Sequence, residues 1–353
     1  MKLKQYLMLS VIVCVLIITS GCTNTNSKLS DKEKKYSVAV VKTPKTNNIF
    51  GKTKIEFFNQ HLKSIKTNKY SYGGVGRTNF GLPIKKGKYI YEMSVGHGID
   101  KKKCKVLQLN TETGEIKEYK VCKYTNNICV DEKYVYGIAN LNGATTVSRT
   151  TIKDNKMDQV EVKNEMCMEC CVYNGDFYRL TDWINGRAFL AKVDFDGKDK
   201  SGNKIELTKY CDEDTEPLSF YEYKNKLYMP GRKSLLYVKN NKVHKIKIKT
   251  LKYTDPILVK GVGNYLYILV ASRHAQNNDW KIIKYNMDLE KIETEYNINS
   301  CAIQYDVVGN KLYIVNFDDE IVEYTMEKDK LTEKNRTEVE VDDNEYISAM
   351  YAK

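Results

Sequence analysis

After its apolar N-terminal segment, the sequence lacks the spacing of apolar residues that marks amphipathic helices. Apolar residues instead fall in short runs separated by polar turns, as in "KVLQLN", "TETG" and "EIKEYKV" over 105–121. Because an amphipathic helix needs an apolar face that repeats about every 3.6 residues, this pattern argues against a helical solenoid. It indicates an all-β protein built from short antiparallel strands.

The sequence also lacks a complete metal-binding motif. The chain has four histidines, and the Cys-x-x-Cys spacing in "CMECC" (167–171) has no second cysteine pair or histidine pair to complete a zinc site. On a strand, Cys170 and Cys171 would point to opposite faces. We therefore expect buried thiols that pack as small apolar groups, and no bound metal.

Catalytic and cofactor motifs are absent as well. We find no Ser/His/Asp set at a recognised spacing and no pair of carboxylates placed to converge. The acidic stretch "DFDGKDKSGN" (194–203) has its glycine out of register with a calcium-binding loop, so we interpret it as a long turn. No catalytic residue and no cofactor is assigned.

The first residues, "MKLKQYLMLSVIVCVLIITSGC", have the layout of an export signal. Lys2 and Lys4 precede an apolar run over 7–18, and small residues lead to Cys22. The run is shorter than the roughly 20 residues of a membrane span. The Gly-Cys junction resembles the bacterial lipobox, although Thr19 stands where that motif usually has leucine. The resemblance implies a signal peptide over 1–21, a lipid on Cys22 and a place on the extracytoplasmic face of the cell membrane.

Residues 22–35 are polar, with no aromatic side chain. Such a segment cannot bury enough apolar surface to order itself. We predict that it is a flexible tether between the lipidated cysteine and a folded domain over 36–353.

One phrase recurs along this domain. "GNYLYIL" (263–269) returns as "GNKLYIV" (309–315), and related phrases place tyrosines at intervals of 39–50 residues, namely Tyr91, Tyr136, Tyr178, Tyr228, Tyr267 and Tyr313. A period in this range indicates a repeat fold. Each period scans as four short strands, which is typical of a β-propeller blade. We expect these tyrosines to pack between adjacent blades.

The two ends of the domain predict how the ring closes. The segment "EYISAMYAK" (345–353) has the pattern of an innermost strand, whereas 36–42 and 54–70 supply only a second, third and fourth strand. The C-terminal strand should therefore complete the first blade, which gives seven blades. Closure of this kind removes both open sheet edges.

Over nearly all of 36–353 the chain resembles the seven-bladed β-propellers of exported bacterial proteins, and with its N-terminus it resembles a bacterial lipoprotein. It lacks the Gly-His and Trp-Asp signature of WD40 repeats and the Asp-box of sialidases. With only Trp183 and Trp280, it also lacks the tryptophan docking pattern of quinoprotein dehydrogenases. The resemblance therefore implies the architecture and none of those activities.

The loops between second and third strands hold the candidate ligand-binding residues. Aromatic and arginine side chains, which are enriched at binding surfaces, gather in these loops. The candidates are His97, Asp182, Trp183, Arg187, Arg232, Arg273, His274 and Trp280. A packing role beneath the loop remains an alternative for the tryptophans, and a turn role remains one for His97.

Charge suggests the partners. The net charge of +12 becomes +10 once Lys2 and Lys4 leave with the signal. A basic surface attracts anionic lipid, wall polymer or acidic polysaccharide, and nucleic acid is not expected at this location. We predict a binding or scaffold module for a wall polymer or an exported protein. The alternatives are a hydrolase or lyase acting on acidic carbohydrate, with the loop acids Asp182, Asp279, Asp318 and Asp319, and a sensor or assembly component at the membrane.

Eight cysteines remain in the mature domain, and they allow 105 disulfide connectivities. One pair stands out. Cys104 and Cys122 flank the turn "TETG" (111–114) almost symmetrically, which puts them opposite each other or one step off register. We predict a cross-strand disulfide between them.

Overall fold

The computed structural model describes residues 29–45, 51–76, 82–95, 104–163, 166–181, 187–195, 204–210, 219–249, 255–271 and 280–353. Its one helical element in these ranges is the short 3-10 helix η1 (Glu33–Lys35). No helix in the described part of the chain is long and apolar enough to cross a membrane. Nearly all other regular structure is antiparallel β-sheet.

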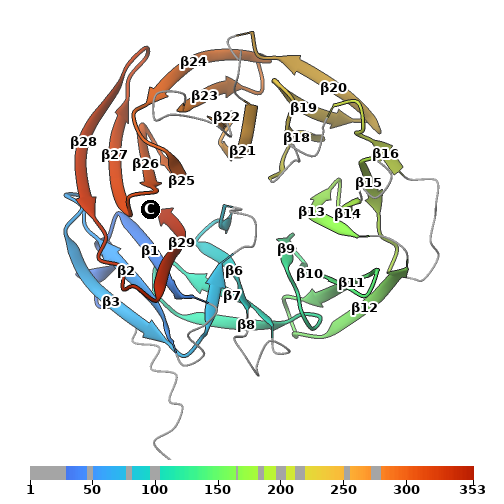
Figure 1. The fold of residues 1–353 in the computed structure, drawn as a ribbon, viewed down its shortest axis with the longest axis horizontal. Coiled ribbons are helices and arrows are strands. Elements are labelled where there is room, and N and C mark those ends of the chain that lie inside the picture. Colours follow the sequence, from blue (N-terminus) through green and yellow to red (C-terminus); the bar gives the residue numbers. More distant parts are fainter. Residues whose placement is uncertain are drawn as a thin grey trace, which may run out of the picture.

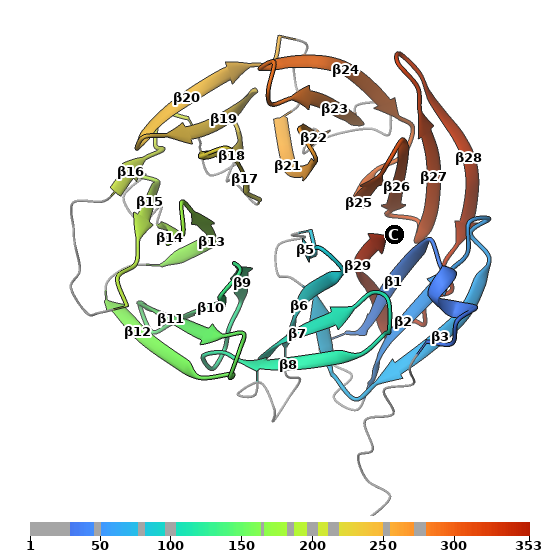
Figure 2. The same ribbon diagram turned by 180° about the vertical axis from the view of Figure 1, so that it is seen from behind.

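Seven sheets form a closed ring around a central channel, as Figures 1 and 2 show from opposite sides. From the channel outward, the first blade contains β29 (Glu345–Ala352), β1 (Val38–Pro44), β2 (Thr53–Phe58) and β3 (Ser64–Tyr70). In the second blade β4 (Gly74–Gly76) and β5 (Ile84–Lys86) share the inner position, and both pair with β6 (Tyr89–Val95), which is followed by β7 (Lys105–Asn110) and β8 (Ile116–Lys120).

The third and fourth blades follow along the chain. Blade 3 contains β9 (Asn127–Val130), β10 (Tyr134–Leu141), β11 (Ala144–Thr151) and β12 (Met157–Lys163). Blade 4 contains β13 (Cys167–Tyr173), β14 (Asp176–Thr181), β15 (Phe189–Lys192) and β16 (Lys204–Glu206).

Three blades complete the circle. Blade 5 contains β17 (Tyr221–Tyr223), β18 (Lys226–Gly231), β19 (Ser234–Lys239) and β20 (Lys242–Lys247). Blade 6 contains β21 (Asp255–Val262), β22 (Tyr265–Ala271), β23 (Trp280–Asn286) and β24 (Lys291–Ile298). Blade 7 contains β25 (Ala302–Val308), β26 (Lys311–Asn316), β27 (Glu320–Met326) and β28 (Leu331–Glu338).

The C-terminal strand closes the ring, and the predicted fold class is confirmed. Strand β29 runs antiparallel to β1, with Val38 opposite Ala352 and Pro44 opposite Glu345. In this arrangement the inner strand of the first blade comes from the end of the chain and its other three strands come from the beginning (Figure 1). The pairing covers the inner edge of β1, which would otherwise be open.

The recurring tyrosines form the seams between blades, as the sequence predicts. Tyr267 of blade 6 packs in one buried cluster with Tyr305 of blade 7. Tyr313 of blade 7 packs with Val38 of blade 1. Between blades 3 and 4, the ring of Tyr136 stacks on Phe177 with centroids 4.6 Å apart. These contacts bury apolar area on both partners, which makes them core residues rather than ligand contacts.

The segment that enters the first blade is packed against the ring. Leu29 is only 4% exposed, and its N–H donates to the carbonyl of Thr113 in blade 2 at 3.0 Å. The hydroxyl of Tyr36 donates to the carbonyl of Thr111, and Glu33 pairs with Lys66 of blade 1 at 2.8 Å. The sequence interpretation of 22–35 as a flexible tether therefore does not hold for residues 29–35. Its polar composition concealed the anchoring contacts of Leu29 and Glu33.

The antiparallel blades give the ring two different faces. One face, called here the loop face, carries the loops between second and third strands and the connections between blades. The opposite face, called here the turn face, carries the turns that join first to second and third to fourth strands. Thr111 and Thr113 belong to a third-to-fourth turn, so residues 29–36 dock on the turn face.

Candidate binding surface

Five of the eight candidate ligand-binding residues lie outside the described part of the chain. They are His97, Asp182, Trp183, Arg273 and His274. The prediction that they form a binding surface stays a prediction. The remaining three are Arg187, Arg232 and Trp280, and each has a defined environment.

The two arginines lie on the loop face, on either side of one blade-to-blade connection. Both are exposed. Next to Arg187, the N–H of Ala188 donates to Thr208 Oγ1 at 3.1 Å. The N–H of Arg232 donates to the carbonyl of Tyr210 at 3.1 Å. The backbone at both arginines is thus tied to the same connection between blades 4 and 5, which fixes them at neighbouring positions of the rim.

The environment of Trp280 favours the packing alternative over a ligand contact. Trp280 opens β23 and is 8% exposed, with its ring in the buried cluster that also contains Tyr305 and Ala302 of blade 7. Among the described residues, its Nε1 has no hydrogen-bond partner. A packing role beneath the loop accounts for this environment, because a ligand contact through the ring would require it to leave the core.

Exposed apolar side chains, which sequence reasoning missed, mark the loop face. Within the described ranges six large apolar side chains are exposed, and five of them lie on the loop face. Tyr124, Met166 and Phe317 are in loops or blade-to-blade connections, and Leu141 and Tyr346 are at strand ends beside them. The sixth, Leu289, lies on the turn face. Single exposed apolar residues are ordinary on a protein surface. Their bias to one face makes the loop face the candidate for a binding surface.

Hydrogen bonds between Asn140 and Cys167 connect the two chain segments that carry Leu141 and Met166. The side-chain amide of Asn140 donates to the carbonyl of Cys167 at 2.7 Å. Its Oδ1 accepts a hydrogen bond from the backbone N–H of Cys167 at 3.0 Å. Their sequence neighbours Leu141, 50% exposed, and Met166 are therefore brought to the same part of the rim. The hairpin turn after Leu141 has positive φ at Asn142 and Gly143, the geometry that an Asn-Gly pair provides.

A second apolar spot lies where blades 7 and 1 meet. Phe317 is 62% exposed, and its N–H donates to the carbonyl of Cys301 at 3.2 Å. Tyr346 follows Glu345, whose carboxylate pairs with Lys54 at 2.8 Å. These backbone and ionic contacts fix the strand ends that present the two rings. A rigid frame of this kind lowers the entropy cost of presenting apolar groups to a partner.

The acids proposed for the enzymatic alternative give little support to it. Asp182 and Asp279 lie outside the described residues. Asp318 and Asp319 are consecutive in the turn after Asn316. Burial, and then the neighbouring charge of Asp318, raises the pKa of Asp319. A raised carboxyl pKa also arises in ordinary turns, so these two adjacent acids alone do not define a general acid and base.

Buried cysteines occur mainly in blades 2, 3 and 4. Cys104 and Cys122 stand just beyond the paired ends of β7 and β8, where Lys105 is opposite Lys120. Both are buried free thiols in the structure. Burial, with a smaller effect of nearby Cys104, raises the pKa of Cys122. Their disulfide stays a prediction. Within the described ranges, His, Cys, Asp and Glu side chains form no group of three or more that could hold a metal ion.

Comparisons with known proteins support the fold. No family model matches the chain, and no curated protein matches it either. Among solved structures, a protein of unknown function from Desulfotomaculum acetoxidans is similar, with 13% identity and a TM-score of 0.53 over 87% of this chain and 100% of that one. Hsv2 of Kluyveromyces lactis is also similar, with 10% identity and a TM-score of 0.51 over 86% of this chain and 100% of that one. At such identities the likeness shows the fold alone.

Proposed function

We propose that this chain is a lipid-anchored, extracytoplasmic binding module that holds an exported protein partner on its loop face. The observation that carries the proposal is the contrast between the two faces. Residues 29–36 dock on the turn face, whereas five of the six exposed large apolar side chains in the described ranges lie on the loop face.

The short link between Cys22 and Leu29 supports the orientation. Six residues separate them, and seven extended residue steps span at most about 25 Å. A lipid on Cys22 would therefore hold the turn face close to the membrane. The loop face would then point outward, toward other exported proteins.

The chemistry of the loop face favours a protein partner over an anionic polymer. Phe317, Tyr346 and Leu141 offer apolar contact area, and Arg187 and Arg232 offer the planar donors common in protein interfaces. A polymer of acidic groups would instead be recognised mainly through lysines, by a salt-sensitive attraction without hot spots.

A matched pair of variants tests this proposal. The full chain is purified from membranes with its bound proteins, as the parent, as Leu141→Ser/Met166→Ser/Phe317→Ser and as Leu289→Ser. We expect one protein in stoichiometric amount with the parent and with Leu289→Ser, and its loss with the triple variant. Both variants should keep the parent's melting temperature, since the replaced side chains are exposed.

Two results would overturn the proposal. One is equal recovery of the same proteins with all three chains. The other is binding to purified anionic wall polymer that the triple variant retains and that moderate salt abolishes. In that case diffuse basic attraction would be the function of the surface.

A further inference from the structure

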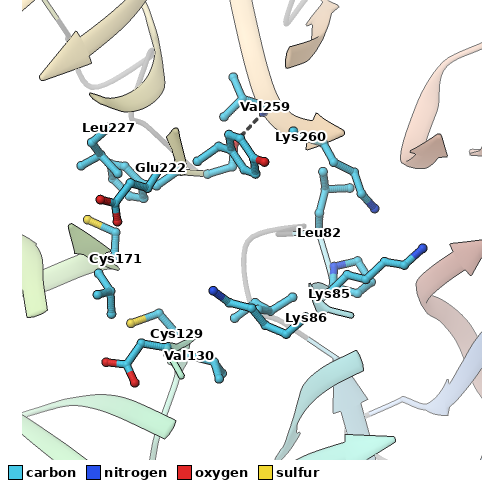
Figure 3. Close-up of a pocket in the computed structure, with 18 of the residues that line it drawn as sticks. Leu82, Lys85, Lys86, Cys129, Val130, Cys171, Glu222, Leu227, Val259 and Lys260 are labelled. Atoms are coloured by element: carbon cyan, nitrogen blue, oxygen red, sulfur yellow. Dashed lines mark hydrogen bonds between the residues drawn. The ribbon is translucent and has the colours of Figure 1, made fainter. Parts of the chain in front are cut away.

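The central channel contains a cavity of about 930 Å³, whose mouth is formed by first-to-second turns at the turn face. Three cysteines line one side of it, namely Cys129 of β9 and the neighbours Cys170 and Cys171 of β13. Figure 3 labels Cys129 and Cys171 on this side, which blades 3 and 4 form. The volume is enough to admit a small organic molecule. A small reagent in the channel would therefore pass beside these cysteines.

Cys129 and Cys170 lie at nearly the same height in neighbouring inner strands. Both strands begin at the loop face and run toward the turn face, since each leads into a first-to-second turn. The side-chain amide of Asn127 in β9 donates to the carbonyl of Met168 in β13 at 3.2 Å. Two residues further along the two strands are Cys129 and Cys170. This register brings the two cysteines side by side.

The two side chains also point into the same seam between blades. Successive residues on a strand face opposite sides. In β9, Cys129 packs in the buried cluster between blades 3 and 4, whereas its neighbour Ile128 packs toward blade 2. In β13, Cys170 packs in that same cluster, whereas Cys171 packs toward blade 5. Cys129 and Cys170 therefore face each other across one seam.

The two thiols are close enough to affect each other. Cys129 is 8% exposed and Cys170 is 3% exposed, and both are free thiols in the structure. Burial, and then a hydrogen bond with the Cys170 thiol, raises the pKa of Cys129. A disulfide requires its sulfur atoms about 2.05 Å apart and its Cβ atoms about 4 Å apart. Thiols already in hydrogen-bonding contact are the pairs in a fold that come nearest to this geometry.

The other cysteines of β13 have different neighbours. Cys167 belongs to the same seam, but its thiol donates to the carbonyl of Glu169 at 3.1 Å. Cys171 directly follows Cys170, and the alternation of the strand turns its thiol away from the seam. The register therefore singles out Cys170 as the partner of Cys129.

We propose that Cys129 and Cys170 are a redox-active pair, which a small disulfide in the channel oxidises to a bond that joins the inner strands of blades 3 and 4. These strands belong to different sheets, so no backbone ladder holds them together.

The reaction is a thiol–disulfide exchange in two steps. One cysteine thiolate attacks a sulfur of the small disulfide, whose S–S bond breaks and releases one small thiol. The other cysteine then attacks the sulfur of the first, and the second small thiol leaves. Overall the two cysteines lose two protons and two electrons, and the small disulfide gains them.

The test uses the full chain in detergent, first reduced and then incubated with 2-hydroxyethyl disulfide at about pH 8.5, where thiolates form. The remaining thiols are alkylated, and the peptides are mapped by mass without reduction. We expect a linked species that contains Cys129 and Cys170. Cys171→Ala is the matched control, since Cys171 is 4% exposed and lines the same cavity but faces blade 5. It should keep the linked species, and Cys129→Ala should lose it.

Thermal melting measures what the bond does to the seam. Oxidation should raise the melting temperature of the parent by roughly 5 °C more than that of Cys129→Ala, because the bond closes the loop from 129 to 170, and reductant should reverse the difference. Recovery of both cysteines of the parent as thiols, or as separate mixed disulfides, would overturn the proposal. So would a bond from either of them to Cys167 or Cys171. Equal melting shifts in the parent and Cys129→Ala would refute the role of the bond in holding the two blades.

Discussion

The carboxylate of Asp306 in blade 7 accepts the backbone N–H of Ala352 in the closing strand at 2.8 Å. The carbonyl of Ala352 in turn accepts a hydrogen bond from Lys85 of blade 2 at 2.8 Å. The end of β29 is therefore held from both neighbouring blades, in addition to its pairing with β1. Through Lys260, the same carboxylate also reaches blade 6. A buried ion pair thus joins the blades at the point of ring closure, beside the strand pairing.

Replacement of Asp306 by asparagine should destabilise the ring. The change would leave the ammonium group of Lys260, whose side chain is 12% exposed, without its counter-charge. Removing one member of a buried ion pair typically lowers the free energy of unfolding by about 3 kcal/mol or more. Chemical denaturation measures the change, with Asp342→Asn as a control at an exposed pair. An unfolding midpoint equal to the parent's would show that the carboxylate is dispensable for closure.

Acid should weaken the seam between blades 1 and 2 through Glu118. Burial opposes ionisation of this carboxyl, but hydrogen bonds from Lys105 and Tyr72 outweigh it and hold its pKa below the usual value of 4.5. A group with a depressed folded-state pKa stabilises the fold fully above its unfolded pKa, and the stabilisation is lost as the pH falls through the folded pKa.

Glu118→Gln should therefore lose less stability than the parent between about pH 5 and pH 3. Thermal melts across this range measure it, and Glu112→Gln, at an exposed turn carboxylate, should follow the parent. Parallel pH profiles for Glu118→Gln and the parent would count against a stabilising role for this contact.

Membrane attachment should depend on Cys22. Cys22→Ala removes the only residue that can carry the lipid at the predicted cleavage junction. We expect the variant to be released from the membrane fraction or to keep its signal peptide, as seen by fractionation and intact mass. A processed variant that stays with the membrane like the parent would contradict lipid anchoring.

Cys104 and Cys122 should form a disulfide bond when the protein is isolated from its oxidising compartment. Both lie just beyond the paired ends of β7 and β8, and the nearby Cys104 influences the pKa of Cys122. Peptide mapping under non-reducing conditions should recover the two cysteines in one linked species. Detection of both as alkylated thiols in protein unfolded without reductant would disprove the pairing.

The sequence by itself determined the repeat, the four strands of a blade and the closure of the ring. These follow from local periodicity, because alternation and turn residues are written within each stretch of about 40 residues. It also indicated the loop face, since the place of a loop within a blade decides the end of the ring at which it lies. The packing role of Tyr267 was readable for the same reason, as it recurs at one position of the repeat.

The tertiary structure decided which side chains meet. Lys85, Lys260 and Asp306 come from three blades, and no local pattern sets them around one cavity. Trp280 reads as a loop aromatic in the sequence but is buried against blade 7, because its neighbours come from another repeat. Leu29 lies in a polar stretch and is buried against a turn of blade 2. Each of these contacts joins distant segments, and only the closed ring brings those segments together.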